Sequence, residues 1–192
     1  TEEYDGTSWT TGNTTPVGIN SHTGSFGTQT AALAVSGNQP PGTVVGVFAY
    51  NGTDWTVSAS VNTAKEAAGG FGTTTSALVT GISGQGTESW NGTSWTEVAE
   101  KNTDRALYGG ASGTSNTDGL VYGGTPPTTG KTEFWNGTSW TELADMATSR
   151  TTAGVGNSSV NALAASGLIP PVTSATEDWT APEYVVKTFT TS

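Results

Sequence analysis

Few side chains in this sequence could perform chemistry. The 192-residue chain holds a single histidine, His22, and no cysteine. A Ser-His-Asp triad would depend on His22, and no Gly-x-Ser-x-Gly nucleophile elbow accompanies it. Without cysteine there can be no disulfide framework and no thiolate metal site. The sequence therefore predicts a protein that is not an enzyme, with no catalytic residue, no metal and no cofactor.

Carboxylates form the next candidate group, because glutamates recur at one position of a repeated segment, at Glu2, Glu88, Glu133 and Glu177. Basic residues recur with the same period at Lys65, Arg105 and Arg150. A ring of carboxylates could bind calcium. The shared period favours instead an ion pair between each glutamate and a basic residue, across strands or neighbouring repeats. Phe48 replaces the glutamate in the second copy, so a carboxylate ring would be incomplete.

Asparagine offers a third candidate group. Asn-x-Ser/Thr sequons begin at Asn13, Asn51, Asn91, Asn136 and Asn157. Those at Asn51, Asn91 and Asn136 read Asn-Gly-Thr, which is also a turn sequence. The turn is a sufficient explanation for them, and glycosylation would require a secretory eukaryotic source.

Proline-rich loops are the candidate binding sites. They read GNQPPGT over 37–43, GGTPPTT over 123–129 and GLIPPVT over 167–173. Pro-Pro pairs stiffen a loop and so reduce the entropy lost on binding a partner, but they can equally serve only to end a strand and block edge pairing. Recognition residues commonly lie on loops held by a rigid scaffold. The candidate ligand contacts are Gln39, Pro40, Pro41, Pro126, Pro127, Thr128, Pro170 and Pro171.

These residues belong to an internal repeat. Ten-residue segments of one pattern start at Thr1 (TEEYDGTSWT), Val47 (VFAYNGTDWT), Thr87 (TESWNGTSWT) and Thr132 (TEFWNGTSWT). A truncated copy, TEDWT, starts at Thr176. The aromatic residues before the turns are separated by 46, 40, 45 and 44 residues. A recurring period of this length is typical of repeat folds.

Each copy predicts a β-hairpin. An aromatic residue ends the first strand, Asn-Gly or Asp-Gly forms the turn, and a tryptophan follows five residues after the aromatic residue. Asn-Gly and Asp-Gly accept the positive φ values of a type I′ turn, whose twist suits the flanking strands. We therefore expect the two aromatic rings to flank each turn.

A second unit lies between the hairpins, over residues 23–37, 65–82, 105–124 and 150–167. Each copy has a strand of small residues, a polar turn and an apolar strand that ends at glycine. Together with a hairpin it gives four strands per repeat, as in one blade of a β-propeller. The small residues suit an innermost strand, because neighbouring blades crowd the central axis.

Composition agrees with an all-β fold, because 27 glycines and frequent Asn and Pro interrupt short apolar groups. Seven Trp, five Tyr and five Phe argue against disorder. A net charge of −10 with only six dispersed basic residues argues against a nucleic-acid-binding face and against an anionic membrane surface. No apolar run approaches the ~18 residues of a membrane span.

The period, the Gly-Gly pairs and the late tryptophan of each copy resemble the kelch repeat. The resemblance covers nearly the whole chain and implies a kelch-like β-propeller of four-stranded blades, in a single domain over residues 1–192. Its repeats would span about 1–46, 47–86, 87–131 and 132–175, with closing strands in 176–192. In kelch terms the chain begins at the third strand of a blade.

A count of four blades and a count of five both stay open. In the first, the inner unit 150–167 joins the hairpin 1–10 and closes a four-bladed ring. In the second, each inner unit stays with the hairpin that follows it, the tail 183–191 is a final strand, and residues 1–10 are half of a fifth blade. Trp179 and the strand-like tail favour the second.

The Thr- and Gly-rich style, with TEEYDGTSWT, NTAK at 62–65, GTQTAALAVSG at 27–37 and the ending KTFTTS, resembles kelch-type arrays in structural proteins of marine tailed phages, especially cyanophages. The first inner unit departs from the pattern, with Thr23 in place of the basic residue. The resemblance implies an extracellular virion-surface protein of a tail, a fibre or a head decoration.

Its partners would be other virion proteins and a host-surface glycan or protein, with no nucleic acid and no membrane insertion. The alternative is a purely structural module that decorates or assembles a particle without a specific ligand.

Overall fold

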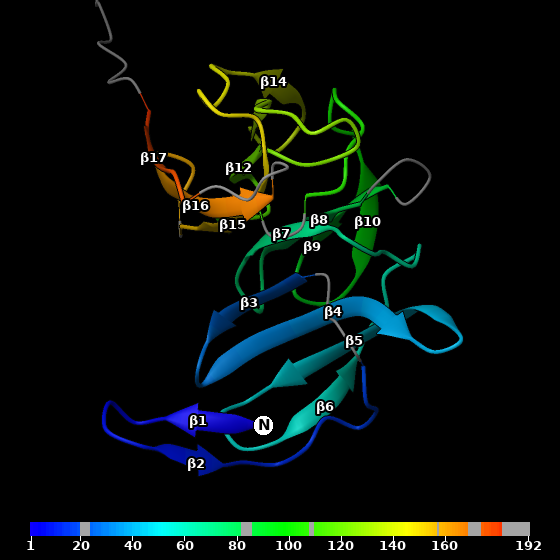
Figure 1. The fold of residues 1–192 in the computed structure, drawn as a ribbon. Coiled ribbons are helices and arrows are strands. Elements are labelled where there is room, and N and C mark those ends of the chain that lie inside the picture. The colour runs from blue at the N-terminus through cyan, green and yellow to red at the C-terminus, as the bar shows by residue number, and fades with distance from the viewer. Residues whose placement is uncertain (20–23, 82–85, 108–109, 157, 169–173, 182–192) are drawn as a thin grey trace, which may run out of the picture.

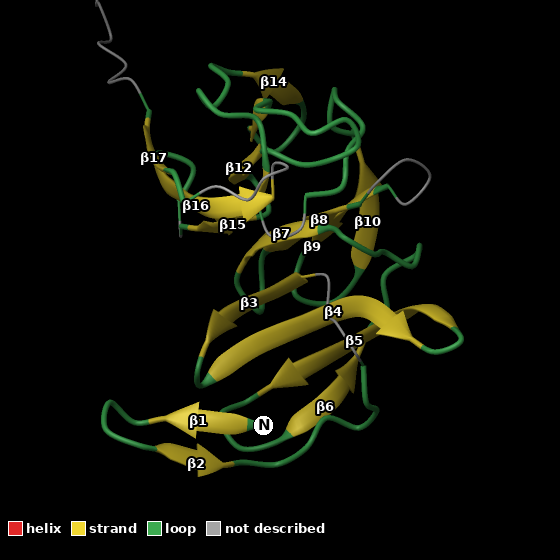
Figure 2. Cartoon of the chain, in the orientation of Figure 1, coloured by secondary structure: helices red, strands yellow, loops and turns green. Residues whose placement is uncertain are grey.

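Antiparallel strands make up the regular structure of the chain (Figures 1 and 2). The computed structural model describes residues 1–19, 24–81, 86–107, 110–156, 158–168 and 174–181, and within these ranges it has seventeen strands and no helix. Short apolar segments broken by Gly, Asn and Pro form strands rather than helices, since a helix needs a longer uninterrupted run. The predicted all-β class is confirmed.

Most of the strands form four-stranded antiparallel sheets in which each strand pairs with the next one along the chain. Sheet 1 comprises β3 (Gly24–Thr28), β4 (Ala31–Gln39), β5 (Gly42–Tyr50) and β6 (Trp55–Ser58). Sheet 2 comprises β7 (Gly69–Gly72), β8 (Ala77–Thr80), β9 (Thr87–Trp90) and β10 (Trp95–Val98). Sheet 3 comprises β11 (Ala111–Ser115), β12 (Asp118–Tyr122), β13 (Thr132–Trp135) and β14 (Trp140–Glu142).

Smaller sheets lie at the two ends of the series. The N-terminal hairpin consists of β1 (Glu2–Tyr4) and β2 (Trp9–Thr11). Sheet 4 consists of β15 (Thr151–Val155), β16 (Asn161–Leu168) and β17 (Thr176–Thr180). In Figure 1 the sheets follow one another from the N-terminal hairpin at the bottom, through sheets 1 and 2, to sheets 3 and 4 at the top.

The predicted hairpins are present, with their aromatic rings in contact across the strands. Trp90 pairs with Trp95 in sheet 2, and Trp135 pairs with Trp140 in sheet 3. The ring centroids are 5.1 Å and 5.2 Å apart in these two pairs. Contacts of this kind add to the stability that burial of the rings already gives.

The predicted type I′ turn is wrong. The glycine of each hairpin loop has a positive φ, for example 93° at Gly92, but none of the preceding Asn or Asp residues does. The loop instead has four residues, in which Asn91 Oδ1 accepts hydrogen bonds from the backbone N–H of Thr93 and of Ser94, both at 2.9 Å. The asparagine therefore acts through its side chain as an Asx turn rather than by adopting the left-handed conformation.

Successive sheets pack through their first strands. β3 contacts β7, β7 contacts β11, and β11 contacts β15. Glycine makes this close approach possible, because a Cβ on Gly113 or Gly119 of sheet 3 would collide with the Phe71 ring of sheet 2. Gly113 of the first strand and Gly119 of the second strand of sheet 3 thus admit the neighbouring sheet, and the position of the first strands at a central axis stays a prediction.

Ring closure is not seen within the described ranges, so the fold is confirmed as a series of repeated antiparallel sheets. β16 pairs with β17, and this pairing occupies the edge that the hairpin 1–10 would need in order to close a four-bladed ring. Each inner unit lies in one sheet with the hairpin that follows it. The blade count stays a prediction, and the tail 183–191 lies outside the described residues.

Candidate functional site

The proline loops lie at the tips between the second and third strands of their sheets. Gln39 ends β4 and pairs with Gly42 at the start of β5, leaving Pro40 and Pro41 exposed at the tip. Pro126, Pro127 and Thr128 are exposed between β12 and β13. Pro170 and Pro171 lie outside the described residues.

The bases of these loops are fixed by hydrogen bonds to the next sheet. In sheet 1, Ser36 Oγ donates to the carbonyl of Val44 (2.6 Å) and accepts the backbone N–H of Lys65 (2.8 Å). In sheet 3, the N–H of Gly124 donates to the carbonyl of Arg150 at 2.9 Å, and the N–H of Arg150 donates to the carbonyl of Thr129 at 3.2 Å. Both loops thus lie at equivalent positions, between the second and third strands of sheets 1 and 3, and sheet 2 lies between these two sheets in the series.

Buried ion pairs lie beside the bases of the loops. Lys65 Nζ is 2.7 Å from Glu88, Arg105 Nη1 is 2.5 Å from Glu133, and Arg150 Nη2 is 3.0 Å from Glu177. The side chains of the first two pairs are 0% exposed. Each pair joins a basic residue in the segment before the first strand of a sheet to the third strand of the same sheet. The predicted ion pair is confirmed for Glu88, Glu133 and Glu177.

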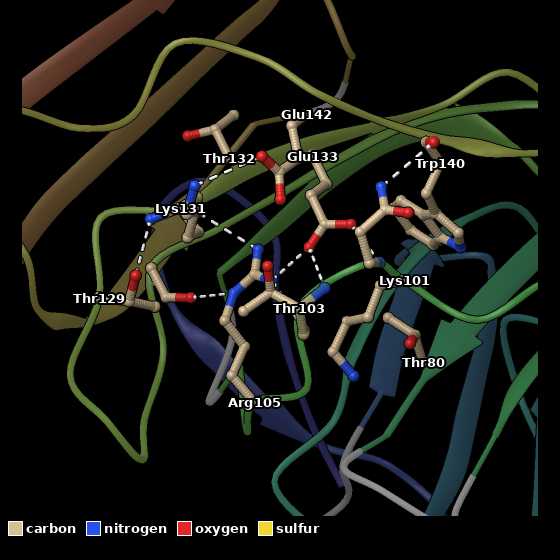
Figure 3. A network of polar contacts seen from close by, with 12 residues as sticks. Thr80, Lys101, Thr103, Arg105, Thr129, Lys131, Thr132, Glu133, Trp140 and Glu142 are labelled. Carbon is tan, nitrogen blue, oxygen red and sulfur yellow. Dashed lines mark hydrogen bonds and ion pairs between the residues drawn. The ribbon is translucent and has the colours of Figure 1, made fainter.

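Backbone amides complete the coordination of each carboxylate. Glu133 accepts the N–H groups of Asn102 and Thr103 as well as the Arg105 guanidinium (Figure 3). Glu88 and Glu177 each accept a corresponding pair of N–H groups. These donors occupy the oxygens that a calcium ion would need. Among the residues that the structure describes, no three His, Asp or Glu side chains come together to hold a metal ion.

The guanidinium of Arg150 makes fewer hydrogen bonds than that of Arg105. Arg105 Nε donates to the carbonyl of Gly123 and Nη2 to that of Lys131. Arg150 Nε and Nη1 are buried and have no hydrogen-bond partner in the described part of the chain.

Lys101 is one of the six basic residues of the chain, and it is buried. It is 7% exposed, and Nζ donates to the carbonyl of Gly81. Burial, and after it the nearby charge of Arg105, lower the pKa of Lys101 below its usual 10.5. Val61 and Met146 occupy the same position in the other repeats, and this alignment is the signal that could have identified Lys101 as buried.

A pocket lies between sheets 3 and 4. Aromatic and small apolar residues line it, including Tyr122, Ala144, Ala162 and Trp179. Burial raises the pKa of Tyr122 to about 12, so the phenol stays neutral at ordinary pH. The carboxylates of Asp145, Glu177 and Asp178 lie at the same pocket.

The N-terminal hairpin presents aromatic rings to solvent. Trp9 is 68% exposed and Tyr4 is 46% exposed, whereas the equivalent Trp95 and Trp140 are 6% and 7% exposed. Trp95 is covered because it packs into a core with residues of the preceding sheet 1, a covering that the described residues do not supply for the N-terminal hairpin.

The other candidates have structural roles or lie outside the described ranges. Asn51, Asn91 and Asn136 form the Asx turns of their hairpins, as Oδ1 accepts two backbone N–H groups in each. Asn13 donates from Nδ2 to Asp54 at 2.5 Å. His22 and Asn157 are not among the described residues.

Comparison of the chain with protein-family models and with curated proteins gives no match. Among the residues that the structure describes, no helix is long and hydrophobic enough to cross a membrane.

Proposed function

We propose that this protein is a non-enzymatic virion-surface protein of a tail, a fibre or a head decoration, whose loops recognise a host-surface glycan or protein. Its repeated sheets would be the blades of a kelch-like propeller of four to five blades. The proposal rests on the resemblance of the repeats to kelch-type phage proteins and on the geometry of the loops. Other virion proteins would be its partners, without nucleic acid or membrane insertion.

The observation that carries the proposal is the contrast between each exposed loop tip and its fixed base. Pro40, Pro41, Pro126 and Pro127 face solvent, while hydrogen bonds from backbone N–H groups tie the bases of their loops to the next sheet. A loop held in this way loses little conformational entropy when a partner binds. Gln39 and Thr128 add polar groups, which suit the hydroxyl-rich surface of a glycan.

A glycan array with the purified chain tests this function. The Gln39→Ala, Thr128→Ala double variant should weaken saturable binding about tenfold, or about 1.4 kcal/mol. The control is Gln29→Ala with Thr117→Ala, which removes an exposed glutamine and an exposed threonine from first-to-second-strand turns at the other end of the sheets. The control should bind like the native chain. Absence of saturable binding, or equal losses in both variants, would contradict the proposal.

The exposed rings of the N-terminal hairpin favour a second candidate, a structural assembly module. Trp9 and Tyr4 would be covered by another chain, as Trp95 and Trp140 are covered within this one. Light scattering on a sizing column tests it: an oligomer that Trp9→Ser reduces to the 19.4 kDa monomer would support assembly. A native chain that stays monomeric at every concentration would eliminate this candidate.

A further inference from the structure

The four hairpin loops share one backbone geometry but differ in one side chain. They comprise residues 5–8, 51–54, 91–94 and 136–139, and in each the backbone N–H of the first residue donates to the carbonyl of the fourth. The φ of the glycine at the second position lies between 92° and 98° in all four. The first residue is asparagine in three loops and aspartate in the N-terminal one. The same backbone therefore accommodates an amide and a carboxylate at the same place.

Aspartate makes the same backbone hydrogen bonds as asparagine. Asp5 Oδ1 accepts the N–H groups of Thr7 and Ser8, both at 2.8 Å, as Asn91 Oδ1 accepts the equivalent pair at 2.9 Å. The N–H of Ser8, and after it that of Thr7, lower the pKa of Asp5 below its usual 3.8. Hydrogen bonds to a charged acceptor are stronger than those to a neutral one. The loop thus holds a carboxylate at least as well as an amide.

A serine at the fourth position bonds to either group. Asn91 Nδ2 donates to Ser94 Oγ at 3.4 Å, whereas Ser8 Oγ donates to Asp5 Oδ2 at 3.4 Å. The loop 136–139 repeats the asparagine arrangement at 3.3 Å. A hydroxyl both donates and accepts, so the serine can serve an amide or a carboxylate without a change in the backbone.

The loop 51–54 lacks this serine. Its fourth residue is Asp54, whose charged carboxylate accepts hydrogen bonds but donates none. A carboxylate in place of the Asn51 amide would therefore gain no donor from Asp54 and would be repelled by it. Two of the three Asn-Gly loops are thus suited to aspartate, and the third is not.

We propose that Asn91 and Asn136 are sites of spontaneous deamidation, and that their loops keep the same structure once aspartate has formed. In the reaction the backbone nitrogen of the following glycine attacks the asparagine Cγ, a cyclic imide forms and ammonia leaves. Water then opens the imide, so the net change replaces the side-chain NH2 by OH, which ionises and adds a negative charge. Opening at the other carbonyl gives isoaspartate, which lengthens the main chain and so changes the loop.

Exposure of the two loops favours this reaction. Asn91 and Asn136 are exposed, and the glycine that supplies the attacking nitrogen has no side chain to obstruct it. The two N–H groups that lie 2.9 Å from Asn91 Oδ1 would also stabilise the negative charge that develops on this oxygen during the attack. The hairpin loops lie at the opposite end of the strands from the proline loops, so the reaction does not depend on any ligand of the proline loops.

Incubation of the purified chain at mildly alkaline pH, followed by ion-exchange chromatography and peptide mass spectrometry, tests the reactivity. Asn161 is the internal control, because it is exposed but is followed by alanine. Deamidation at Asn91 and Asn136 should be at least about tenfold faster than at Asn161. Equal rates at the three positions, or no reaction at Asn91 and Asn136, would overturn the proposal.

Urea denaturation of two variants tests whether the loops accept the product. Asn91→Asp should leave the equilibrium constant of folding unchanged or higher, because the carboxylate keeps both N–H donors and gains the Ser94 hydroxyl. Asn51→Asp should lower this constant about threefold, because Asp54 repels the new charge, and high salt should reduce the loss by screening. Equal losses in the two variants, or an Asn91→Asp chain that does not fold, would show that the loops are not suited to aspartate.

Discussion

At the scale of single residues, the molecule depends on buried ion pairs that occur once per sheet. Arg105 and Glu133 have no exposed side-chain surface, and backbone groups satisfy their remaining donors and acceptors. A buried pair is stabilising only when its hydrogen bonds are complete, because taking charges out of water is costly. In sheet 1 Phe48 stands at the glutamate position and is buried, so this sheet has an apolar side chain where the others have a carboxylate.

Removing one charge from such a pair should be severe. Glu133→Gln leaves the Arg105 guanidinium buried without a counter-charge, and we expect a loss of about 3 kcal/mol or more in the free energy of unfolding. Glu142→Gln removes the exposed Lys131–Glu142 pair of the same sheet, 3.4 Å apart, and should cost less than about 1 kcal/mol. Urea denaturation of both variants measures the difference. Equal losses in the free energy of unfolding would mean that the buried ion pair stabilises the protein no more than the exposed pair does.

The buried charge of Lys101 should lower the free energy of unfolding at neutral pH. Its pKa is lower in the folded chain than in the unfolded chain, so protonation favours unfolding, and stability rises as pH increases toward 10.5. Lys101→Met introduces the residue found at the equivalent Met146 and should stabilise the protein at pH 7 by about 1 kcal/mol. The gain should shrink as pH rises, which thermal unfolding from pH 7 to 10 would measure. A gain that does not depend on pH would assign the effect to packing alone.

At the scale of the elements, close approach between sheets depends on glycine. Gly119→Ala places a methyl group against the Phe71 ring and should cost about 1–3 kcal/mol, as overpacking does. Adding Phe71→Leu should recover part of this loss, which a double-mutant cycle would measure. Gly42→Ala is the control, because a methyl group there would have no neighbour within 4 Å and the φ of Gly42 is not positive. Strict additivity of the two core substitutions would show that Gly119 and Phe71 are not coupled.

The elements also show what the sequence could and could not predict. Hairpins, inner strands and the ion pairs follow from local repeats, so the spacing of Trp90 and Trp95 or of Arg105 and Glu133 was enough to predict them. The turn type was missed because Asn-Gly suits two geometries, and the choice depends on whether the Asn91 side chain bonds to the backbone. The burial of Lys101 was missed because its charge favours the surface, and only the packing of neighbouring sheets overrides that preference.

At the scale of the whole molecule, the arrangement of the sheets relative to one another cannot be predicted from the repeats. The repeats predict that sheets follow one another, but which loops end side by side depends on how each sheet is rotated against the next. The proline loops of sheets 1 and 3 lie at equivalent ends with sheet 2 between them, so they offer two points of contact rather than one pocket. A partner that touches both must be extended, as a glycan chain or a protein surface is.

The measurement that tests this account most directly is amide hydrogen exchange on the chain, with and without the glycan that binds best on the array. If the proline loops bind the glycan, the amides of 37–43 and 123–129 should be protected, with the N-terminal hairpin and the sheet interiors unchanged. Protection confined to β1 and β2, or no change at either loop, would contradict binding at the loops, and the first of these results would assign the interaction to the N-terminal hairpin.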